Sequence, residues 1–382
     1  MAFSDKPFPP AEPVFPPHRD VKKYLEEYAE GVKSLIQFET QVVDVKSIDT
    51  GRWSLTTRSV RTGKRRTEDP YDAVVISNGN YSVPYIPNIP GIEAWNKAYQ
   101  GVISHSKFYD SPEFFRNKKV VVVGNSASGI DIGTQINEYC KGKLLLSSKA
   151  NETPFSGSAD TDKVDCPEIV EFLSPKSHNR GIKFADGRVE EDIDFIVFCT
   201  GYLYSYPFLN SLDPPAVTDG GRTLNVYQQL FYIYNPTLVF TALPQRIVPF
   251  PVAENQAAVF SRVWSGRLAL PSLAEMKLWE DSTIAVKGNG KSFHILTSPG
   301  DVDYLNFLYD WAAKAEKRPG LANGGNGKLG SRWGSKERWL RQRFQDIKKA
   351  FVRKAEQRER VKSAKELGFD YDKWKLEHSS QL

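Results

Sequence analysis

One strand–turn–helix segment constrains the fold of this chain more than any other feature. It consists of Val120–Val123, the turn Gly124–Asn125–Ser126–Ala127–Ser128–Gly129, and a helical pattern from Ser128 to about Tyr139. Four consecutive valines are typical of a strand buried on both faces of a parallel sheet. A strand, a GxSxxG turn and a helix in this order predict an α/β domain with a parallel sheet that binds a dinucleotide.

The residue types in the turn each have a physical reason. Gly124 permits the tight turn, the small Ser126 lets a pyrophosphate approach the backbone, and Gly129 lets the helix pack on the strand. The free N–H groups and the positive dipole end of the helix then attract phosphate. We therefore predict that the turn residues Gly124, Asn125, Ser126, Ala127, Ser128 and Gly129 bind a dinucleotide. A turn with a purely structural role is the alternative.

The end of the next strand indicates which dinucleotide is bound. The predicted strand Lys143–Leu146 is followed by Ser147–Ser148–Lys149, with no acidic residue. A carboxylate there would accept a hydrogen bond from a ribose 2′-hydroxyl, whereas a lysine and serines favour a 2′-phosphate. The sequence therefore predicts NADP rather than NAD, with Lys149 as a ligand; a solvated lysine is the alternative.

A repeated template predicts a second nucleotide-binding domain. Asp72–Gly79 and Asp194–Gly201 each contain an aspartate, an apolar run and a glycine seven positions later. Continuous apolar runs predict strands buried on both faces. In two-domain flavoproteins such a strand closes each nucleotide-binding domain beside its cofactor, which makes Asn78, Gly79 and Gly201 candidate cofactor-binding residues. Residues 1–71 contain no GxGxxG, so we expect the first domain to lack its opening turn.

Composition excludes several other classes of protein. Three cysteines without a CxxC pair argue against a disulfide framework, a zinc site and a dithiol redox centre. The net charge of +5 arises in residues 331–382, so no nucleic-acid-binding core is indicated. No apolar run reaches the roughly 20 residues of a membrane helix, and the polar, Pro-rich sequence after Met1 leads us to expect no signal peptide. We therefore expect a cytoplasmic protein with no membrane span and no metal.

Three further motifs resemble those of one enzyme family over nearly the whole chain. Residues 99–109, from Tyr99 through Gly101 and His105 to Tyr109, resemble the motif FxGxxxHxxx[FY], with Tyr99 in place of Phe. Phe198–Tyr202 resembles [FL]ATGY with Cys199 in place of Ala, and Phe3–Pro9 resembles an entrance segment of the same family. Together these motifs resemble the flavin-containing monooxygenases, of the fungal, dimethylaniline monooxygenase-like type.

The resemblance implies a specific chemistry. In this family NADPH delivers hydride to FAD, and reduced flavin and molecular oxygen form a C4a-hydroperoxide that oxygenates a soft nucleophile, an amine nitrogen or a sulfide sulfur. The resemblance therefore implies FAD and NADP(H) as cofactors, a small-molecule substrate and no catalytic side chain. It gives Tyr99, Gly101, His105 and Tyr109 a positioning role, with proton transfer by His105 as the alternative. A non-catalytic NADP-binding remnant without FAD is the alternative function.

The resemblance also implies a domain plan of two Rossmann-like domains. A partial FAD-binding domain with a β-meander is expected over residues 1–110, and an NADP-binding domain inserted into it over 111–201. Residues 202–319 return to the FAD domain, 320–330 form a flexible linker and 331–382 form a charged C-terminal helix. The family's FAD fingerprint is expected upstream of this chain, so the FAD domain is incomplete at its N-terminus. Asn78, Gly79 and the segment Leu243–Gln256 would remain on the flavin side.

Overall fold

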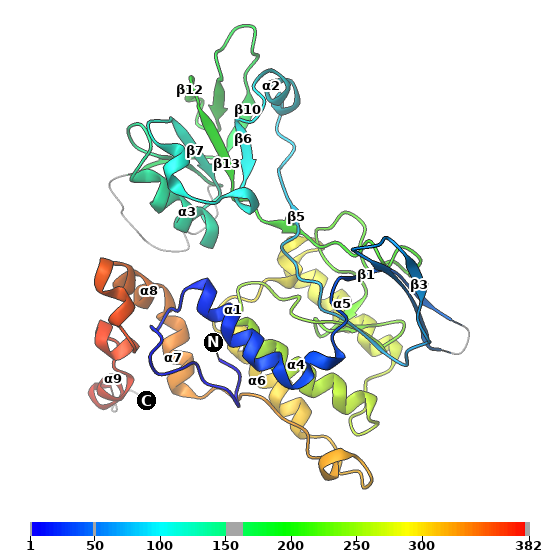
Figure 1. Ribbon diagram of the computed structural model, residues 1–382. Coiled ribbons are helices and arrows are strands. Elements are labelled where there is room, and N and C mark those ends of the chain that lie inside the picture. The colour runs from blue at the N-terminus through cyan, green and yellow to red at the C-terminus, as the bar shows by residue number, and fades with distance from the viewer. Residues whose placement is uncertain (1, 49–50, 150–162, 379–382) are drawn as a thin grey trace. The chain divides into compact units, whose positions relative to one another are not determined.

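The computed structural model describes residues 2–48, 51–149 and 163–378. The chain forms two compact units (Figure 1). Unit 1 combines Met1–Gly79 with Tyr206–Leu382, so it is discontinuous in sequence, and unit 2 is the continuous segment Asn80–Ser205. Each unit has its own sheets and its own apolar core.

Unit 2 is built on a five-stranded parallel sheet, which confirms the predicted α/β class. Its strand order is β6 (Ile103–His105), β13 (Phe195–Phe198), β7 (Val120–Val123), β8 (Leu145–Ser147) and β9 (Val164–Cys166). The four valines of β7 are buried on both faces, as their run predicts. On one face they meet α3 (Ala127–Asn137) through Ile132 and Ile136, and on the other they join a core around Trp95 and Phe172.

The smaller elements of unit 2 explain where it begins. They are β5 (Val83–Pro84), α2 (Ile92–Ala98), η2 (Ser106–Phe108), η3 (Pro112–Phe115), β10 (Ile169–Phe172), β11 (Ile182–Phe184), β12 (Val189–Glu190) and β14 (Tyr202–Leu203). Strand β5 pairs with β14, and β6 pairs with β13, so the segment before Ser111 belongs to the same compact unit. The unit therefore starts at Asn80, whereas the NADP-binding domain expected from sequence starts at residue 111.

Unit 1 contains two sheets. The expected meander is present as β1 (Thr40–Ser47), β2 (Trp53–Ser59) and β3 (Arg65–Thr67), which follow α1 (His18–Ala29) and η1 (Glu30–Leu35). The second sheet has the order β15 (Val226–Tyr227), β16 (Phe231–Tyr232), β17 (Leu238–Phe240) and β4 (Val74–Ile76). Only the pair β17–β4 in this sheet is parallel.

Strand β4 corrects one prediction. The run Asp72–Gly79 predicts a strand buried on both faces, but β4 lies at the edge of its sheet in the described part of the chain. Only Ile76 of its three residues is buried, and Val75 is 40% exposed. The physical reason is that β4 pairs with β17 on one side alone, so apolar side chains remain uncovered.

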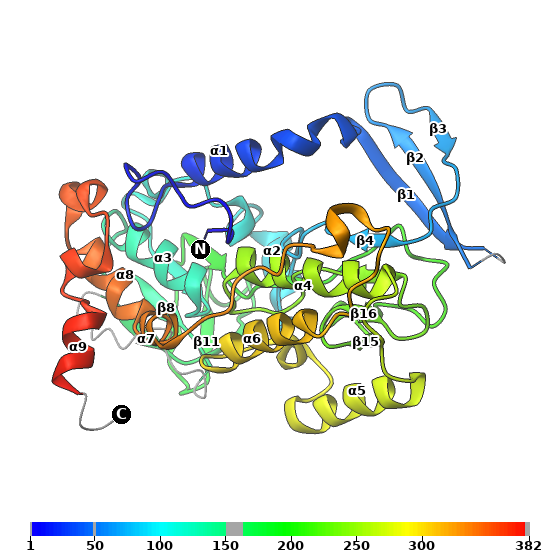
Figure 2. The ribbon, with the colours of Figure 1, turned by 90° about the horizontal axis from the view of Figure 1, so that it is seen from below.

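Helices form the rest of unit 1. The longest, α4 (Pro249–Trp264), packs beside α6 (Gly300–Ala313), and the two lie side by side in Figure 2. Val252 and Val259 of α4 and Leu305 and Leu308 of α6 are almost fully buried in the core between these helices and the sheet. The remaining helical segments are α5 (Leu273–Lys287), η4 (Lys291–His294) and η5 (Ala322–Gly325).

The C-terminal region differs from the single charged helix expected over residues 331–382. It consists of α7 (Ser335–Gln342), α8 (Phe344–Val352), η6 (Ala355–Arg360), η7 (Ala364–Leu367) and α9 (Tyr371–Glu377). The three α-helices turn apolar or aromatic residues inward: Trp339 of α7, Ile347 and Phe351 of α8, and Tyr371 of α9. A straight helix could not bury all of these side chains against one body, so the helix is broken.

The segment expected to be a flexible linker is instead held in place. Arg262 of α4, which is 5% exposed, donates hydrogen bonds to the carbonyl oxygens of Gly327 (2.7 Å) and Lys328 (3.0 Å). Asn255 donates to the carbonyl oxygen of Ser331 (2.8 Å) and accepts from its N–H (3.0 Å). Buried side chains of α4 satisfy the backbone of this Gly-rich segment, which the sequence pattern could not reveal.

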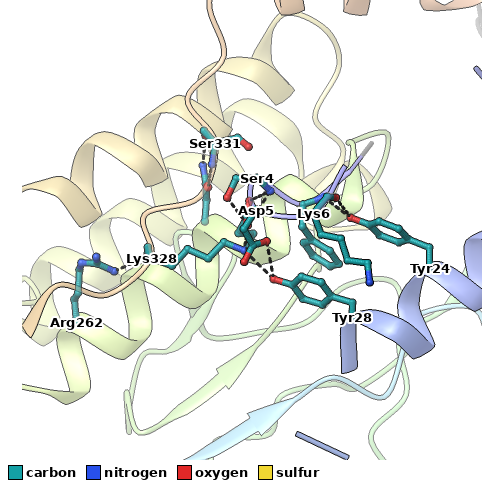
Figure 3. A network of polar contacts seen from close by, with 11 residues as sticks. Ser4, Asp5, Lys6, Tyr24, Tyr28, Arg262, Lys328 and Ser331 are labelled. Atoms are coloured by element: carbon teal, nitrogen blue, oxygen red, sulfur yellow. Dashed lines mark hydrogen bonds and ion pairs between the residues drawn. The ribbon is translucent and has the colours of Figure 1, made fainter. Parts of the chain in front are cut away.

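A charge network joins this segment to the start of the chain (Figure 3). The ammonium group of Lys328 pairs with Glu254 of α4 and with Asp5 (2.6 Å), and it donates a hydrogen bond to the hydroxyl of Tyr28 (2.7 Å). The Glu254 carboxylate, whose side chain is 4% exposed, also accepts from the N–H (3.1 Å) and the hydroxyl (2.8 Å) of Ser4. Burial opposes the charge of Lys328, but these hydrogen bonds outweigh it and raise its pKa.

We predict that Lys328→Met destabilises unit 1. The substitution keeps an apolar stem but leaves the buried Glu254 carboxylate without a cation, and breaking such a pair costs about 3–5 kcal/mol. The loss should lie near the lower end of that range, since the Lys328 side chain is 36% exposed. Urea denaturation followed by tryptophan fluorescence measures the free energy of unfolding.

The control is Lys365→Met, which breaks the exposed ion pair with Asp370 and should change stability little. Adding Glu254→Gln to Lys328→Met should recover part of the loss, because no unpaired charge then remains. Equal stability of Lys328→Met and Lys365→Met would contradict the role given to the buried carboxylate.

Candidate dinucleotide-binding site

The carboxyl ends of four parallel strands of unit 2 meet at one edge of the sheet. The register places His105 opposite Phe198, Phe198 opposite Val123, and Val123 opposite Ser147. After β7 the chain steps through α3 to β8 and β9 on one side, while β13 and β6 lie on the other side. Open α/β sheets bind ligands where the strand order changes direction in this way.

The turn after β7 has a geometry that only small residues allow. Gly124 has a φ of +106°, and a Cβ added there would lie 2.8 Å from the carbonyl oxygen of Cys199. A Cβ added at Gly129 would lie 1.7 Å from the carbonyl oxygen of Gly124. The first turn of α3 therefore packs directly on the end of β7. Cys199, the departure from the [FL]ATGY pattern, lies against both glycines.

The outer side of this turn is open. Ser126, Ala127 and Ser128 are exposed, and no side chain caps the N-terminus of α3. Asn125 is only 7% exposed, and its amide forms no hydrogen bond with any residue in the described ranges. Free backbone N–H groups at a helix N-terminus favour phosphate. The residues present therefore fit the pyrophosphate of a dinucleotide.

His105 is held by backbone groups on both sides of its ring. Nδ1 accepts a hydrogen bond from the N–H of Lys107 (3.1 Å), so Nε2 carries the proton and donates to the carbonyl oxygen of Gly201 (3.0 Å). The ring is 1% exposed and lies edge-on to Tyr202 at 4.9 Å. This geometry suits a residue that positions the loop after β13 rather than one that transfers protons.

The other residues of the motif at 99–109 contact parts of unit 2 away from Gly201. Tyr99 donates a hydrogen bond to the carbonyl oxygen of His178 (3.3 Å), and Gly101 lies in the exposed turn before β6. Tyr109 donates to Gln135 of α3 (3.1 Å), and burial raises its pKa to about 12. Tyr99 and Tyr109 thus tie the motif to unit 2 itself.

Thr200 also holds the loop after β13, although its sequence position alone did not indicate this. Its hydroxyl donates to the carbonyl oxygen of Tyr85, and the N–H of Tyr85 donates to the carbonyl oxygen of Gly201 (2.9 Å). Together with His105 these bonds fix both sides of the loop at Gly201. The threonine inside the [FL]ATGY-like motif was the available signal.

At the end of β8, the three residues predicted to bind the 2′-phosphate lie in different environments. Ser147 is fully buried and its hydroxyl donates to the carbonyl oxygen of Pro167 (2.9 Å), so it is not a free donor. Ser148 is half-buried and Lys149 is exposed. The predicted set of 2′-phosphate ligands is therefore reduced to Lys149 and Ser148, because the hydroxyl of Ser147 is already bonded to a backbone carbonyl.

On the flavin side, Asn78 and Gly79 are exposed and follow β4 in unit 1. Three polar side chains of Leu243–Gln256 have protein partners: Glu254 binds Ser4, Asn255 binds Ser331, and Gln256 binds Tyr304 (2.9 Å). In the described residues, the turn after β7 is the single strand-to-helix turn with GxGxxG-type spacing. The described residues thus provide no pyrophosphate cradle for FAD.

Within residues 2–48, 51–149 and 163–378, no helix is both long enough and apolar enough to cross a lipid bilayer. In the same residues, no three His, Cys, Asp or Glu side chains gather in an arrangement that could hold a metal ion.

Comparison with known proteins identifies the class. The model of the family described as flavin-binding monooxygenase-like matches residues 1–161 and 172–323. The thiol-specific monooxygenase of Saccharomyces cerevisiae is 33% identical over 287 residues, which cover 71% of this chain and 63% of that protein. Flavin-containing monooxygenase FMO GS-OX3 of Arabidopsis thaliana is 36% identical over 269 residues, covering 69% of this chain and 55% of that protein.

A solved structure shows the same fold with sequence similarity. S-allyl-L-cysteine S-oxygenase from Allium sativum has a TM-score of 0.75 and 26% identity, and the match covers 100% of this chain and 82% of that chain. The chain belongs to the flavin-binding monooxygenase-like family. Membership of this family implies FAD and NADP(H) as cofactors. The chain spans less than two thirds of the yeast relative's length.

We predict that Gly129→Ala abolishes NADPH binding. Its Cβ would meet the backbone of Gly124 at 1.7 Å, so α3 must move away from β7 and the turn must open. Gly133→Ala in the same helix is the matched control, since its Cβ meets only the flexible end of Leu144 at 3.2 Å. Fluorescence titration with NADPH measures both. Unchanged binding by Gly129→Ala would show that the turn does not contact the cofactor.

We also predict that Lys149→Ala weakens NADPH binding about tenfold and leaves NADH binding almost unchanged. One charge-assisted contact to a 2′-phosphate contributes about 1.5–3 kcal/mol, and NADH lacks that phosphate. Calorimetric titration with both cofactors measures the ratio. Lys141→Ala, at another exposed lysine of unit 2, should change neither affinity. Equal losses for the two cofactors would refute the assignment of Lys149.

Proposed function

We propose that this protein is an NADPH- and FAD-dependent monooxygenase that oxygenates a soft nucleophile. The observation that carries the proposal is the open turn after β7, where Gly124 and Gly129 allow close packing and Ser126–Ser128 leave the N-terminus of α3 exposed. Membership of the flavin-binding monooxygenase-like family supports the same activity.

We assign the chain's own residues the following tasks. The backbone of Gly124–Gly129 binds the pyrophosphate of NADPH, and Lys149 binds its 2′-phosphate. His105 and Thr200 position the loop at Gly201. This loop follows the carboxyl end of β13, which lies beside the turn after β7. When bound, NADPH supplies hydride and FAD supplies the activation of oxygen, so no acid–base pair of side chains is required.

We propose that the atom oxygenated in the substrate is a sulfur atom in preference to an amine nitrogen. Two relatives support this order: the yeast relative is named a thiol-specific monooxygenase, and the Allium protein is named an S-allyl-L-cysteine S-oxygenase. Both matches cover more than two thirds of this chain. An amine such as N,N-dimethylaniline is the second candidate.

The test is product formation with both cofactors supplied. Protein whose bound FAD has been confirmed by its flavin absorbance is incubated with NADPH, oxygen and either methyl p-tolyl sulfide or N,N-dimethylaniline, and the sulfoxide and N-oxide are quantified by mass spectrometry. We expect sulfoxide to exceed N-oxide. Ser126→Asp places a carboxylate where the pyrophosphate binds, so it should remove the product, whereas Ser177→Asp, at an exposed serine, should not.

The result that overturns the proposal is equally specific. If NADPH binds but neither product forms in the presence of FAD, the non-catalytic NADP-binding alternative is favoured. If N-oxide exceeds sulfoxide, the order of the two substrate classes is reversed.

A further inference from the structure

Unit 1 contains a cavity that the proposed oxygenation does not use. It has a volume of about 350 Å³, within the range of small-molecule sites. Its lining residues come from β15, from the loop between α4 and α5, from α6 and from the C-cap residue of α6: Tyr227, Ala269, Leu270, Pro271, Phe307, Asp310, Trp311 and Lys314. All of them belong to unit 1, whereas the dinucleotide turn belongs to unit 2.

One face of α6 forms a wall of this cavity. Asp310 and Trp311 lie three and four positions after Phe307, and Lys314, the C-cap residue, lies four and three positions after them, so all four share one side of the helix and its C-terminal end. Trp311 contacts both neighbouring rings of the lining: its centroid lies 5.6 Å from Phe307 and 6.0 Å from Tyr227. The cavity therefore offers aromatic surface from two different elements. Phe307 is 40% exposed, although it is a large apolar residue.

The charges at the cavity are not balanced. Both carboxylate oxygens of Asp310 accept hydrogen bonds from Arg332, at 2.9 and 3.3 Å, and this interaction lowers the pKa of Asp310. Lys314 is exposed, and its ammonium group forms no ion pair or hydrogen bond with the part of the chain that the structure describes. Asp310 is thus neutralised by Arg332, and the charge that remains is the positive charge of Lys314.

We propose that this cavity binds a small carboxylate with an aromatic or other apolar tail. The tail packs against Tyr227, Phe307 and Trp311, and the carboxylate pairs with Lys314. A cationic ligand would be repelled by Lys314. No free carboxylate would offset this repulsion, because Asp310 is paired with Arg332. A neutral ligand of the same shape gains the apolar contact and lacks the ion pair. The proposal does not depend on the oxygenase activity.

Calorimetric titration of the 382-residue chain with three probes of one shape tests the proposal. The probes are 4-phenylbutyrate, 4-phenylbutan-1-ol and 4-phenylbutylamine, which share the phenyl ring and a four-carbon chain and end in a negative, a neutral and a positive group at neutral pH. We expect the acid to bind about fivefold more tightly than the alcohol, and the amine to bind most weakly, since a partly exposed ion pair adds modestly to affinity. NADPH should not displace the acid.

Two variants and one control complete the test. Lys314→Gln should reduce the affinity for the acid to that for the alcohol, while Phe307→Ala should weaken the acid and the alcohol alike. Both positions are exposed, so the fold should tolerate the changes. Lys23→Gln, at an exposed lysine of α1, should have no effect. No binding of the acid at millimolar concentration, equal binding of all three probes, displacement by NADPH, or an unaltered Lys314→Gln variant would each overturn the proposal.

Discussion

Three consecutive buried polar residues of α4 form hydrogen bonds and an ion pair with segments from both parts of unit 1. Glu254, Asn255 and Gln256 are each less than one-tenth exposed, so each must find partners inside the protein. Their partners lie in segments far apart in the sequence: Ser4 and Lys328 for Glu254, Leu305 and Ser331 for Asn255, and Gln229, Ala242 and Tyr304 for Gln256. Each side chain therefore fixes the position of segments that have little regular structure of their own.

The parts of the fold that could be predicted from sequence are those with a local cause. The valine run of β7, the small residues of its turn and the helical pattern of α3 depend on neighbours within about twenty residues, and the structure contains all three elements. The β-meander has the same local origin. The positioning role of His105 stays a prediction; its two backbone partners, Lys107 and Gly201, could not be predicted from the sequence.

The predictions that were wrong concern contacts between distant residues. A Gly-rich stretch has the composition of a linker, but the pattern does not show that Arg262 binds its carbonyl groups. A charged amphipathic run predicts one helix, and only the surface it meets decides that the helix breaks after Gln342. Ser147 has the residue type of a phosphate ligand, yet the adjacent carbonyl of Pro167 takes its hydrogen. The first and the last of these corrections come from a buried polar group with a partner that the sequence does not specify, and the second comes from apolar side chains that are buried against the body of the protein.

The discontinuity of unit 1 has a consequence for synthesis on the ribosome. Unit 2 is one continuous segment, so all of its strands are available as soon as Ser205 has emerged. Residues 1–79 must wait for α4, and the carboxylate of Glu254 must wait for Lys328, which is made 74 positions later. Until α4 emerges, the apolar surface of α1 around Tyr24 has no cover, and until Lys328 emerges a charge destined for burial has no counterion. The nascent chain in this window is therefore the form of the protein that most needs a chaperone.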